Sequence, residues 1–173
     1  MDEQAVGVLL SKDQICEIVG RRYGRAMDWY DLDLLKSCFH PDATLDYGYF
    51  KGNAHEWCAQ RVCEDDPNVL NRFHYVFPPQ IEIDGDAAES EANGIGGHRL
   101  KKGNDIEYHI FGSRYLDQLE RRRGVWRLTR RVVKIDLALI LPGDAALGGK
   151  YATLPFLTQA SPSHPDYRRL SKP

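Results

Sequence analysis

The second half of the chain alternates between extended runs and short turn segments, and this pattern constrains the fold more than any other feature of the sequence. Apolar residues recur there with the period of two that is typical of β-strands, in four runs over residues 71–83, 87–101, 106–120 and 125–138. The segments between the runs carry glycine where hairpin turns need it: Asp84-Gly85-Asp86, Lys102-Gly103-Asn104-Asp105 and Arg123-Gly124. We therefore predict a four-stranded antiparallel meander. A bulge or kink is expected at Pro78-Pro79, because proline cannot donate to a sheet ladder.

The first half of the chain has a helical period instead. Ser11 followed by Gln14 matches a capping box, which predicts that the first helix begins there. Asp31 is expected to cap a second helix that ends before His40-Pro41, followed by a short strand over residues 42–50 and a third helix over residues 53–63. Helices followed by a meander predict an α+β domain, in which the helices cover one face of a curled sheet.

The size and charge of the chain limit the classes of binding partner that we expect. A length of 173 residues suits one domain, and a net charge of −2 gives no electrostatic reason to expect a nucleic-acid or membrane partner. The basic run Arg121–Arg123 is expected to form a charged hairpin tip, and the apolar run Val6–Leu10 is too short for a signal peptide or a membrane span. The four cysteines make no C-x-x-C pair, so we expect free thiols in a reducing cytoplasm rather than a zinc site or a disulfide framework.

The last segment, residues 139–173, differs from the rest. It contains prolines and a Gly148-Gly149 pair, yet it keeps several apolar residues: Leu147, Tyr151, Leu154, Phe156 and Leu157. A tail this apolar is not expected to be free in solvent. We predict that it packs over the mouth of a cavity or onto a neighbouring subunit, and that residues 1–138 form the domain itself.

Two groups of motifs carry a family resemblance. The stretch Arg22–Asp28, followed by Asp31–Leu35 and Cys38–Ala43, resembles the opening of SnoaL-like proteins in the nuclear transport factor 2-like superfamily. Gly112–Asp117 and then Gly124–Leu128 resemble the last hairpin of that family. The likeness spans roughly residues 11–138. It implies a cone-shaped α+β barrel, with N-terminal helices packed on a curled and mainly antiparallel sheet.

The resemblance also implies which residues form a site. Dehydratases and dehydrochlorinases of the family pair an Asp at the end of the first helix with a His on the first strand of the meander, and Asp28 and His74 occupy these positions. The resemblance therefore implies that both are catalytic. Tyr23, Tyr47 and His98 match family positions that contact or polarise the substrate.

An arginine on the final strand binds an anionic group or a developing charge in related enzymes. Arg130 and Arg131 both lie on that strand, and strand alternation sends them to opposite faces. Counting from Trp126 favours Arg131 as the inward-facing, substrate-binding residue. Arg114, on the preceding strand, is expected to pair with an acidic neighbour.

Without the resemblance, the same residues have simpler interpretations. A straight helical wheel places Asp28 away from the apolar face of the first helix, so periodicity gives no reason to bury it. His74 is equally compatible with a structural role on its strand, and Tyr23 and Tyr47 with a role as pocket wall. A hairpin that turns near Asp84-Gly85-Asp86 brings His98 nearly opposite residue 74, which favours a shared pocket.

This set of residues predicts proton-transfer chemistry. An imidazole takes a proton near neutral pH, a carboxylate holds its other nitrogen, and a tyrosine hydroxyl polarises a carbonyl. We predict a dehydratase-like lyase that needs no metal and no cofactor, with His74 as general base and Asp28 orienting it. Its substrate is expected to be a small ring-containing, aromatic molecule that loses water, formaldehyde or halide. The ring of the substrate is inferred from the aromatic side chains that are available to line a pocket: Trp29, Tyr47, Trp57, Phe73, Phe77 and Phe111.

Other functions remain open at this point. An isomerase or polyketide-cyclase-type enzyme would use the same residues, and two histidines with one carboxylate would suit a metal-dependent enzyme. A non-catalytic module that binds a small ligand is a further alternative. We also expect a homo-oligomer, a trimer rather than a dimer, because the apolar tail and the open sheet face need cover.

Overall fold

The computed structural model describes residues 2–63, 67–143, 149, 153–157 and 160–170, apart from the side chain of residue 63. The chain begins with an unbroken helical rod made of α1 (Glu3–Cys16), the π-helical segment η1 (Glu17–Arg22) and α2 (Tyr23–Asp28). Asp2 caps this rod, because its side chain accepts a hydrogen bond from the Gln4 backbone N–H at 2.9 Å. The predicted start at Ser11 is therefore wrong, and Ser11 is buried within α1. Residues three apart are also neighbours inside a formed helix, so the Ser-x-x-Gln spacing does not by itself mark an end.

Two shorter helices follow, and both begin where the sequence predicts. In α3 (Leu32–Ser37) the Asp31 side chain accepts from the Leu34 backbone N–H at 3.0 Å. In α4 (Ala54–Cys63) the Asn53 side chain accepts from the backbone N–H groups of residues 55 and 56, at 2.8 and 3.2 Å. Each cap satisfies a helix donor that would otherwise lack a partner, and its loss typically costs about 1 kcal/mol.

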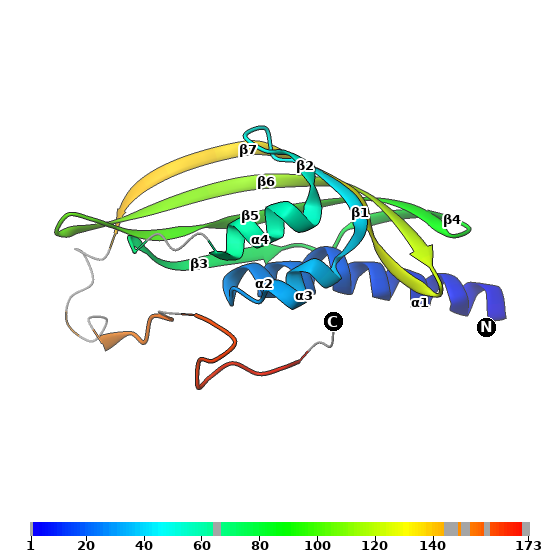
Figure 1. The fold of residues 1–173 in the computed structure, drawn as a ribbon, viewed down its shortest axis with the longest axis horizontal. Coiled ribbons are helices and arrows are strands. Elements are labelled where there is room, and N and C mark those ends of the chain that lie inside the picture. Colours follow the sequence, from blue (N-terminus) through cyan, green and yellow to red (C-terminus); the bar gives the residue numbers. More distant parts are fainter. Residues whose placement is uncertain (1, 64–66, 144–148, 150–152, 158–159, 171–173) are drawn as a thin grey trace.

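In the described part of the chain, seven strands form one sheet in the order β2-β1-β7-β6-β5-β3, with β4 pairing with β5. The strands are β1 (Phe39–Asp46), β2 (Lys51–Asn53), β3 (Val69–Val76), β4 (Gln80–Asp84), β5 (Ala87–Lys102), β6 (Asp105–Arg122) and β7 (Val125–Gly143). β1 pairs with β7 in parallel, and the meander from β3 to β7 is antiparallel as predicted. Figure 1 shows that the sheet curls over the helices without closing into a full barrel.

Two predicted strands are divided. The run over residues 71–83 becomes β3 and β4 on either side of Pro78-Pro79, which confirms the expected interruption. The strand predicted over 42–50 starts earlier, at Phe39, and turns back into β2. Phe39 belongs to β1 because it pairs with Leu128 of β7, a long-range contact that a local pattern cannot indicate.

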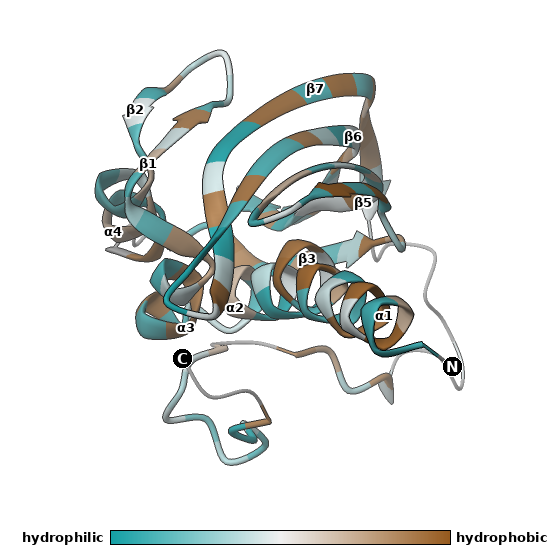
Figure 2. Ribbon diagram, turned by 90° about the vertical axis from the view of Figure 1, so that its right-hand side faces the viewer, coloured by the Kyte–Doolittle hydropathy of each residue, from teal (hydrophilic) through white to brown (hydrophobic). Residues whose placement is uncertain are grey.

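The core lies between the concave face of the sheet and the helical rod. Its largest fully buried apolar side chains come from the rod, from α3 and α4, and from both ends of the sheet: Ile15, Tyr23, Leu34, Leu35, Phe39, Trp57, Leu119, Trp126 and Leu128. Figure 2 shows the curled strands β5, β6 and β7 arching over the helical rod. Each such side chain contributes about 1.5–3 kcal/mol to folding through its removal from water. The expected α+β layering is thereby confirmed.

The described residues of the tail lie in three places: residues 139–143 complete β7, and the centroid of the Phe156 ring lies 4.4 Å from the Arg99 guanidinium carbon of β5. The later residues pack on the outer side of the junction between α2 and α3 (Figure 1). Tyr167 donates a hydrogen bond to the Asp31 carboxylate, and Trp29 contacts the rings of His164 and Tyr167 at centroid distances of 5.6 and 5.4 Å. The Arg25 guanidinium lies 5.0 Å from the centroid of the Tyr167 ring. These contacts are made with the same chain. Leu147 and Tyr151, which were predicted to help anchor the tail, lie outside the described residues.

Three thiols are free, as the cysteine pattern predicts: Cys16, Cys38 and Cys58. Burial raises the pKa of Cys38 and of Cys58 to about 12, which keeps both in the thiol form at neutral pH. Within the described residues, no helix is long and apolar enough to cross a bilayer.

Candidate active site

Asp28 and His74 lie side by side where α2 packs on β3. His74 Nδ1 is 2.6 Å from Asp28 Oδ1, and the His74 backbone N–H donates to Asp28 Oδ2 at 3.1 Å. Both side chains are largely buried, with 13% of the His74 side chain and 21% of the Asp28 side chain exposed. Burial raises the pKa of Asp28 above its ordinary value, and the hydrogen bond from His74 opposes that rise. The structure thus brings the predicted pair together, and its catalytic role remains a prediction.

The helical wheel gave the wrong direction for the Asp28 side chain because the rod is not a uniform α-helix. Between α1 and α2, the segment η1 makes π-helical turns, which hold more residues than α-helical turns. Every residue after η1 is therefore rotated relative to a straight wheel. This rotation carries Asp28 from the predicted solvent side towards β3.

Gly24 allows α2 to approach β3 closely enough for the contact. A Cβ atom at position 24 would lie 3.2 Å from the His74 carbonyl oxygen and 3.5 Å from the His74 Cβ. These distances leave little room for a side chain at this position. The glycine of the Arg22–Asp28 motif therefore sets the distance between the helix and the strand that carry the pair.

His74 lines a cavity of about 160 Å³ inside the curl of the sheet. The remaining lining comes from α2, α4 and four strands or strand connections: Tyr23, Met27, Tyr47, Arg61, Gly96, Gly97, His98, Phe111, Ser113, Tyr115, Val133 and Ile135. Four of the six predicted site residues are in this set, namely His74, Tyr23, Tyr47 and His98. Asp28 lies behind His74 and reaches the cavity through the imidazole ring.

Two neighbouring glycines of β5 leave room for groups that a side chain would displace, and Gly96 makes the room for the His74 ring. A Cβ atom at Gly96 would lie 2.8 Å from His74 Cδ2 and 3.3 Å from His74 Nε2. A Cβ atom at Gly97 would lie 2.1 Å from the His109 carbonyl oxygen. The run Asn93-Gly94-Ile95-Gly96-Gly97-His98 was a usable sequence signal that we missed, because glycine inside a strand often marks a close approach of another group.

Tyr23 and Tyr47 share a short hydroxyl–hydroxyl hydrogen bond at the cavity wall. Tyr47 stacks on Trp57, with ring centroids 4.7 Å apart and ring planes 18° apart, which fixes its orientation. Burial raises the pKa of both hydroxyl groups well above the ordinary value. Both tyrosines are therefore protonated at neutral pH, and because one hydroxyl donates to the other, the pair has one proton left to donate to a ligand.

His98 lines the cavity on β5, two residues further along the ladder than predicted. Its partner across β3 is Arg72, whereas His74 faces Gly96. Burial lowers the pKa of His98 to about 4, and the nearby Arg72 and Arg61 charges act in the same direction. The His98 ring is therefore neutral at pH 7.

Arg131 faces inward and Arg130 outward, as alternation predicts. However, Arg131 is fully buried beneath the cavity, where it makes two 2.8 Å hydrogen bonds to the Asp117 carboxylate. Its guanidinium carbon lies 4.2 Å from the centroid of the Tyr23 ring and 4.6 Å from that of Tyr115. The predicted direct contact between Arg131 and a substrate has no support from this position, since the tyrosine rings stand between the guanidinium and the cavity.

Several cavity residues were not predicted. These include Arg61 at the end of α4, and Ser113 and Tyr115 on β6. Asp117 of β6 points inward, so strand alternation would have predicted that Ser113 and Tyr115 also face inward. The predicted aromatic lining is only partly right. Tyr47 and Phe111 line the cavity, whereas Trp29 contacts the tail and 50% of Phe77 is exposed. Arg114 pairs with Glu91 and Asp136 at 2.7 and 3.4 Å, as expected.

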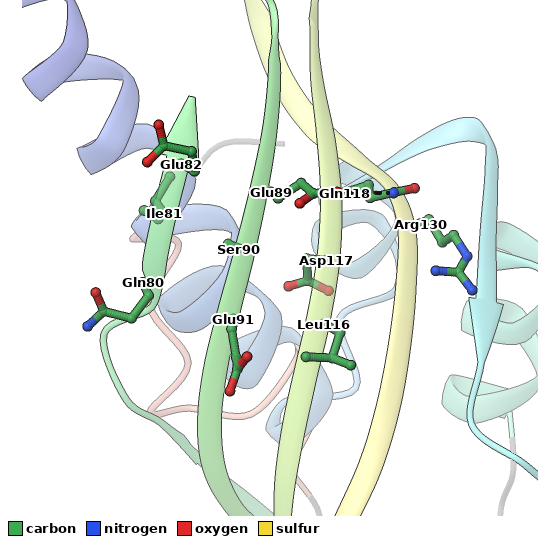
Figure 3. Close-up of a pocket in the computed structure, with 10 residues that line it drawn as sticks. All are labelled: Gln80, Ile81, Glu82, Glu89, Ser90, Glu91, Leu116, Asp117, Gln118 and Arg130. Atoms are coloured by element: carbon green, nitrogen blue, oxygen red, sulfur yellow. Dashed lines mark hydrogen bonds between the residues drawn. The ribbon is translucent and has the colours of Figure 1, made fainter. Parts of the chain in front are cut away.

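A larger hollow of about 420 Å³ lies on the outer face of the sheet, between β4, β5 and β6 (Figure 3). The described residues that line it include Glu82, Glu89 and Glu91 but neither histidine nor tyrosine. Because, of the two, only the smaller cavity combines an imidazole with tyrosine hydroxyl groups among its described residues, we place the candidate active site there. Among the described residues, no group of three or more His, Cys, Asp or Glu side chains is arranged to hold a metal ion.

The fold is similar to that of several solved structures. A hexachlorocyclohexane dehydrochlorinase (LinA) Type2 aligns with a TM-score of 0.70 at 19% identity, over 81% of this chain and 95% of that chain. The LinA-type3 dehydrochlorinase from Novosphingobium barchaimii LL02 aligns with a TM-score of 0.69 at 19% identity, over 79% and 94%. An NTF2-like protein with a cystatin-like fold from Novosphingobium aromaticivorans aligns with a TM-score of 0.61 at 17% identity, over 78% and 87%.

At these identities the structures support the fold alone. No protein of curated function matches the sequence. The SnoaL-like domain model, in contrast, matches residues 8–132, which include most of the rod, the Asp28–His74 pair and most of the sheet. The chain therefore belongs to the SnoaL-like family of the nuclear transport factor 2-like superfamily.

Proposed function

We propose that this protein is a cofactor-independent lyase that catalyses a dehydratase-like elimination on a small ring-containing, aromatic molecule. The observation that carries the proposal is the position of the His74 ring, which touches Asp28 on one side and the cavity on the other. With Nδ1–H donated to Asp28, the imidazole has Nε2 available as a general base. A positioned base of this kind typically contributes about 10²–10⁴-fold to the rate.

In the proposed step, His74 Nε2 removes a proton from a substrate carbon. The electron pair of that C–H bond forms a C=C bond as the neighbouring C–O bond breaks. The imidazolium then returns the proton to the departing oxygen, so that water leaves and His74 is again neutral. Asp28 stabilises the imidazolium between the two transfers, because its carboxylate is hydrogen-bonded to Nδ1.

The tyrosine pair would stabilise charge that develops on a substrate oxygen. In the mutual hydrogen bond of Tyr23 and Tyr47 one hydroxyl donates, and the accepting hydroxyl keeps its own proton for the substrate oxygen. That hydrogen bond and the stack of Tyr47 on Trp57 fix the orientation of the pair. The buried Arg131 cation lies directly under the Tyr23 ring and favours negative charge nearby. We assign Arg131 a positioning and electrostatic role that acts through this tyrosine.

The similarity to dehydrochlorinases supports elimination as the class of reaction. Loss of halide or formaldehyde would use the same acid–base residues as loss of water. The experiment is to incubate the protein with ring-containing β-hydroxy carbonyl compounds, chlorinated cyclohexanes and β-hydroxymethyl aryl compounds, and to follow product masses. A product lighter by water, hydrogen chloride or formaldehyde supports the lyase. A product whose mass is unchanged in H₂O and increases in D₂O through incorporation of deuterium supports an isomerase instead. Unaltered substrate throughout contradicts the proposal.

We further propose a homo-oligomer, with a trimer favoured over a dimer. The outer face of the sheet carries a row of exposed apolar side chains. Tyr75 of β3 pairs with Ile95 of β5, and Leu137 of β7 lies two strands further along. The exposed fractions are 64% for Tyr75, 40% for Ile95 and 47% for Leu137. Contiguous exposed apolar surface of this kind is typical of an interface. Light scattering at micromolar concentration tests this, and a monomer would contradict it.

The free thiols suit a cytoplasmic location, which we include in the proposal.

A further inference from the structure

The turn that follows Asp28 contains a residue in an unfavourable backbone conformation. Tyr30, between α2 and α3, has a φ angle of 55°, in the left-handed region that favours glycine. The backbone N–H of Asp31 donates to the Ala26 carbonyl oxygen at 3.0 Å, which closes the turn onto the end of α2. A residue with a side chain keeps such a conformation only where the surrounding contacts enforce it, and residues of this kind cluster at functional sites.

Contacts on the inner side of the turn connect it to β3. The centroid of the Tyr30 ring lies 4.3 Å from the guanidinium carbon of Arg72, which stands two residues before His74 on that strand. Immediately before the turn, Asp28 accepts its two hydrogen bonds from His74. The strand therefore holds the turn on the side of the candidate active site.

The C-terminal tail holds the same turn from the outer side. Tyr167 donates a hydrogen bond to Oδ2 of Asp31, whose Oδ1 caps α3 by accepting from the Leu34 backbone N–H at 3.0 Å. The Trp29 ring contacts the rings of His164 and Tyr167. Both oxygens of the Asp31 carboxylate are thus engaged, one by the helix and one by the tail.

Arg25 connects the tail to α2 itself. Its guanidinium carbon lies 5.7 Å from the centroid of the Trp29 ring and 5.0 Å from that of Tyr167, and its Nη2 donates to the Arg168 carbonyl oxygen. The tail therefore contacts both ends of the segment 25–31, and Asp28 lies at the centre of that segment.

We infer that Tyr167 is a positioning residue for the proposed elimination: it holds the turn over residues 29–31, and the turn holds the Asp28 carboxylate against His74. This deepens the proposed function, on which it rests, by assigning the tail a part in the same site. Tyr167 is not among the described residues that line the cavity, so it acts only through the turn and Asp28. Release of the tail would let the strained turn relax and loosen the 2.6 Å contact between Asp28 and His74.

The tautomer of His74 tests the inference without requiring turnover. Long-range ¹H–¹⁵N NMR correlations of the imidazole rings show which nitrogen carries the proton, and His74→Gln identifies the His74 signals. In the wild type, the contact with the Asp28 carboxylate should hold the proton on Nδ1, because an ionised carboxylate can only accept. In Tyr167→Ala, the Nε2–H form should reach about 10% or more of the neutral ring, because an imidazole with a loosened partner populates both tautomers.

Two further variants make this change specific. Leu170→Ala is the matched control: it shortens a side chain of the same tail that is 76% exposed, and it should keep the wild-type tautomer. Tyr167→Phe removes only the hydroxyl group and keeps the ring contacts with Trp29 and Arg25. Its share of the Nε2–H form should therefore lie between those of the wild type and Tyr167→Ala.

Steady-state kinetics separate positioning from substrate binding. Tyr167→Ala should lower kcat about 10-fold and leave KM within about 2-fold, because Tyr167 does not contact the cavity. Tyr167→Phe should recover part of that loss, to within about 3-fold of the wild-type kcat. Leu170→Ala should match the wild type in both constants.

Amide hydrogen exchange shows whether the turn has been released. The Asp31 backbone N–H, which donates within the turn, should exchange faster in Tyr167→Ala than in the wild type. Faster exchange with a wild-type His74 tautomer would overturn the inference and limit the tail to a structural role. Unchanged exchange would overturn it too, because Tyr167 would then not hold the turn.

Failure of this inference is distinguishable from failure of the proposed lyase. A His74 tautomer that changes in Tyr167→Ala, in a protein that turns over none of the screened compounds, would support the inferred link to Asp28 and contradict only the lyase. Turnover that is lost in Asp28→Asn but unchanged in Tyr167→Ala would support the lyase and overturn the role of the tail.

Discussion

Asp28 accepts two hydrogen bonds from one residue: the His74 ring nitrogen Nδ1 lies 2.6 Å from its Oδ1, and the His74 backbone nitrogen lies 3.1 Å from its Oδ2. The ring of His74 is therefore held by its own backbone as well as by the carboxylate. This double contact fixes the position of the ring along β3. It also fixes the tautomer, because an ionised carboxylate can only accept.

Replacement of Asp28 by Asn should lower kcat by about 10²–10⁴-fold with little change in KM. An amide can accept from only one of the two N–H groups, and its NH₂ group then favours the wrong tautomer of His74. Steady-state kinetics on the substrate found by the mass screen measure the effect. Asp33→Asn is the control, since Asp33 is exposed on α3 and should behave like the wild type. Equal activity of all three proteins would show that the pair is structural.

Replacement of Gly96 by Ala should lower activity more than stability. The new Cβ would lie 2.8 Å from His74 Cδ2, so the ring must move out of its position. We expect at least about a 10-fold loss of kcat/KM, which corresponds to roughly 1.4 kcal/mol.

Gly7→Ala provides the matched control for that change. Gly7 lies in α1, and a methyl group added there would meet nothing within 4 Å, so alanine should stabilise the protein by about 0.5–1 kcal/mol through helix propensity. Thermal unfolding and kinetics are measured for both variants. A Gly96→Ala enzyme with wild-type kinetics would show that the cavity tolerates a displaced ring.

The burial of His98 should make the protein less stable in mild acid. The His98 pKa falls from 6.5 to about 4 on folding, so between these pH values the unfolded chain binds the proton and the native state does not. Stability is therefore lost as the pH falls from about 6.5 to 4, by up to roughly 3 kcal/mol. In His98→Gln this contribution is absent, and urea unfolding curves between pH 4 and 7 should show a shallower slope. Parallel slopes for the two proteins would rule this explanation out.

Loss of Arg131 alone should destabilise the protein strongly. Arg131→Met leaves the buried Asp117 carboxylate without its two hydrogen bonds, which typically costs about 3–5 kcal/mol. The double variant Arg131→Met with Asp117→Leu should recover most of that loss, because it removes the isolated charge. Denaturant titration measures both, with Arg130→Met expected within about 0.5 kcal/mol of wild type. A double variant as unstable as the single one would contradict the ion-pair explanation.

The double variant also tests the electrostatic role of Arg131. If the cation acts through the Tyr23 ring, the refolded double variant should bind substrate with a near wild-type KM but turn it over more slowly. Unchanged kcat would limit Arg131 to a structural role.

The sequence by itself determined the parts of the fold that depend on local chemistry. Asp31 and Asn53 predicted two helix starts, and the turns at Gly85, Gly103 and Gly124 have the positive φ angles, 59°, 63° and 79°, that favour glycine. The period of two predicted the meander because alternate side chains of a half-buried sheet face opposite environments. These signals need no knowledge of distant residues.

Only the tertiary structure decided how the site is assembled. The π-helical turns of η1 rotate Asp28 towards β3, and a wheel drawn at a uniform angle per residue cannot contain that rotation. Whether Arg131 meets a substrate or the Asp117 carboxylate depends on which side chains share the interior. The same holds for Arg61 and His98, which come from α4 and β5 to line one cavity. Strand alternation gives a side chain its face, but its partner on that face comes from other elements, and only packing brings those elements together.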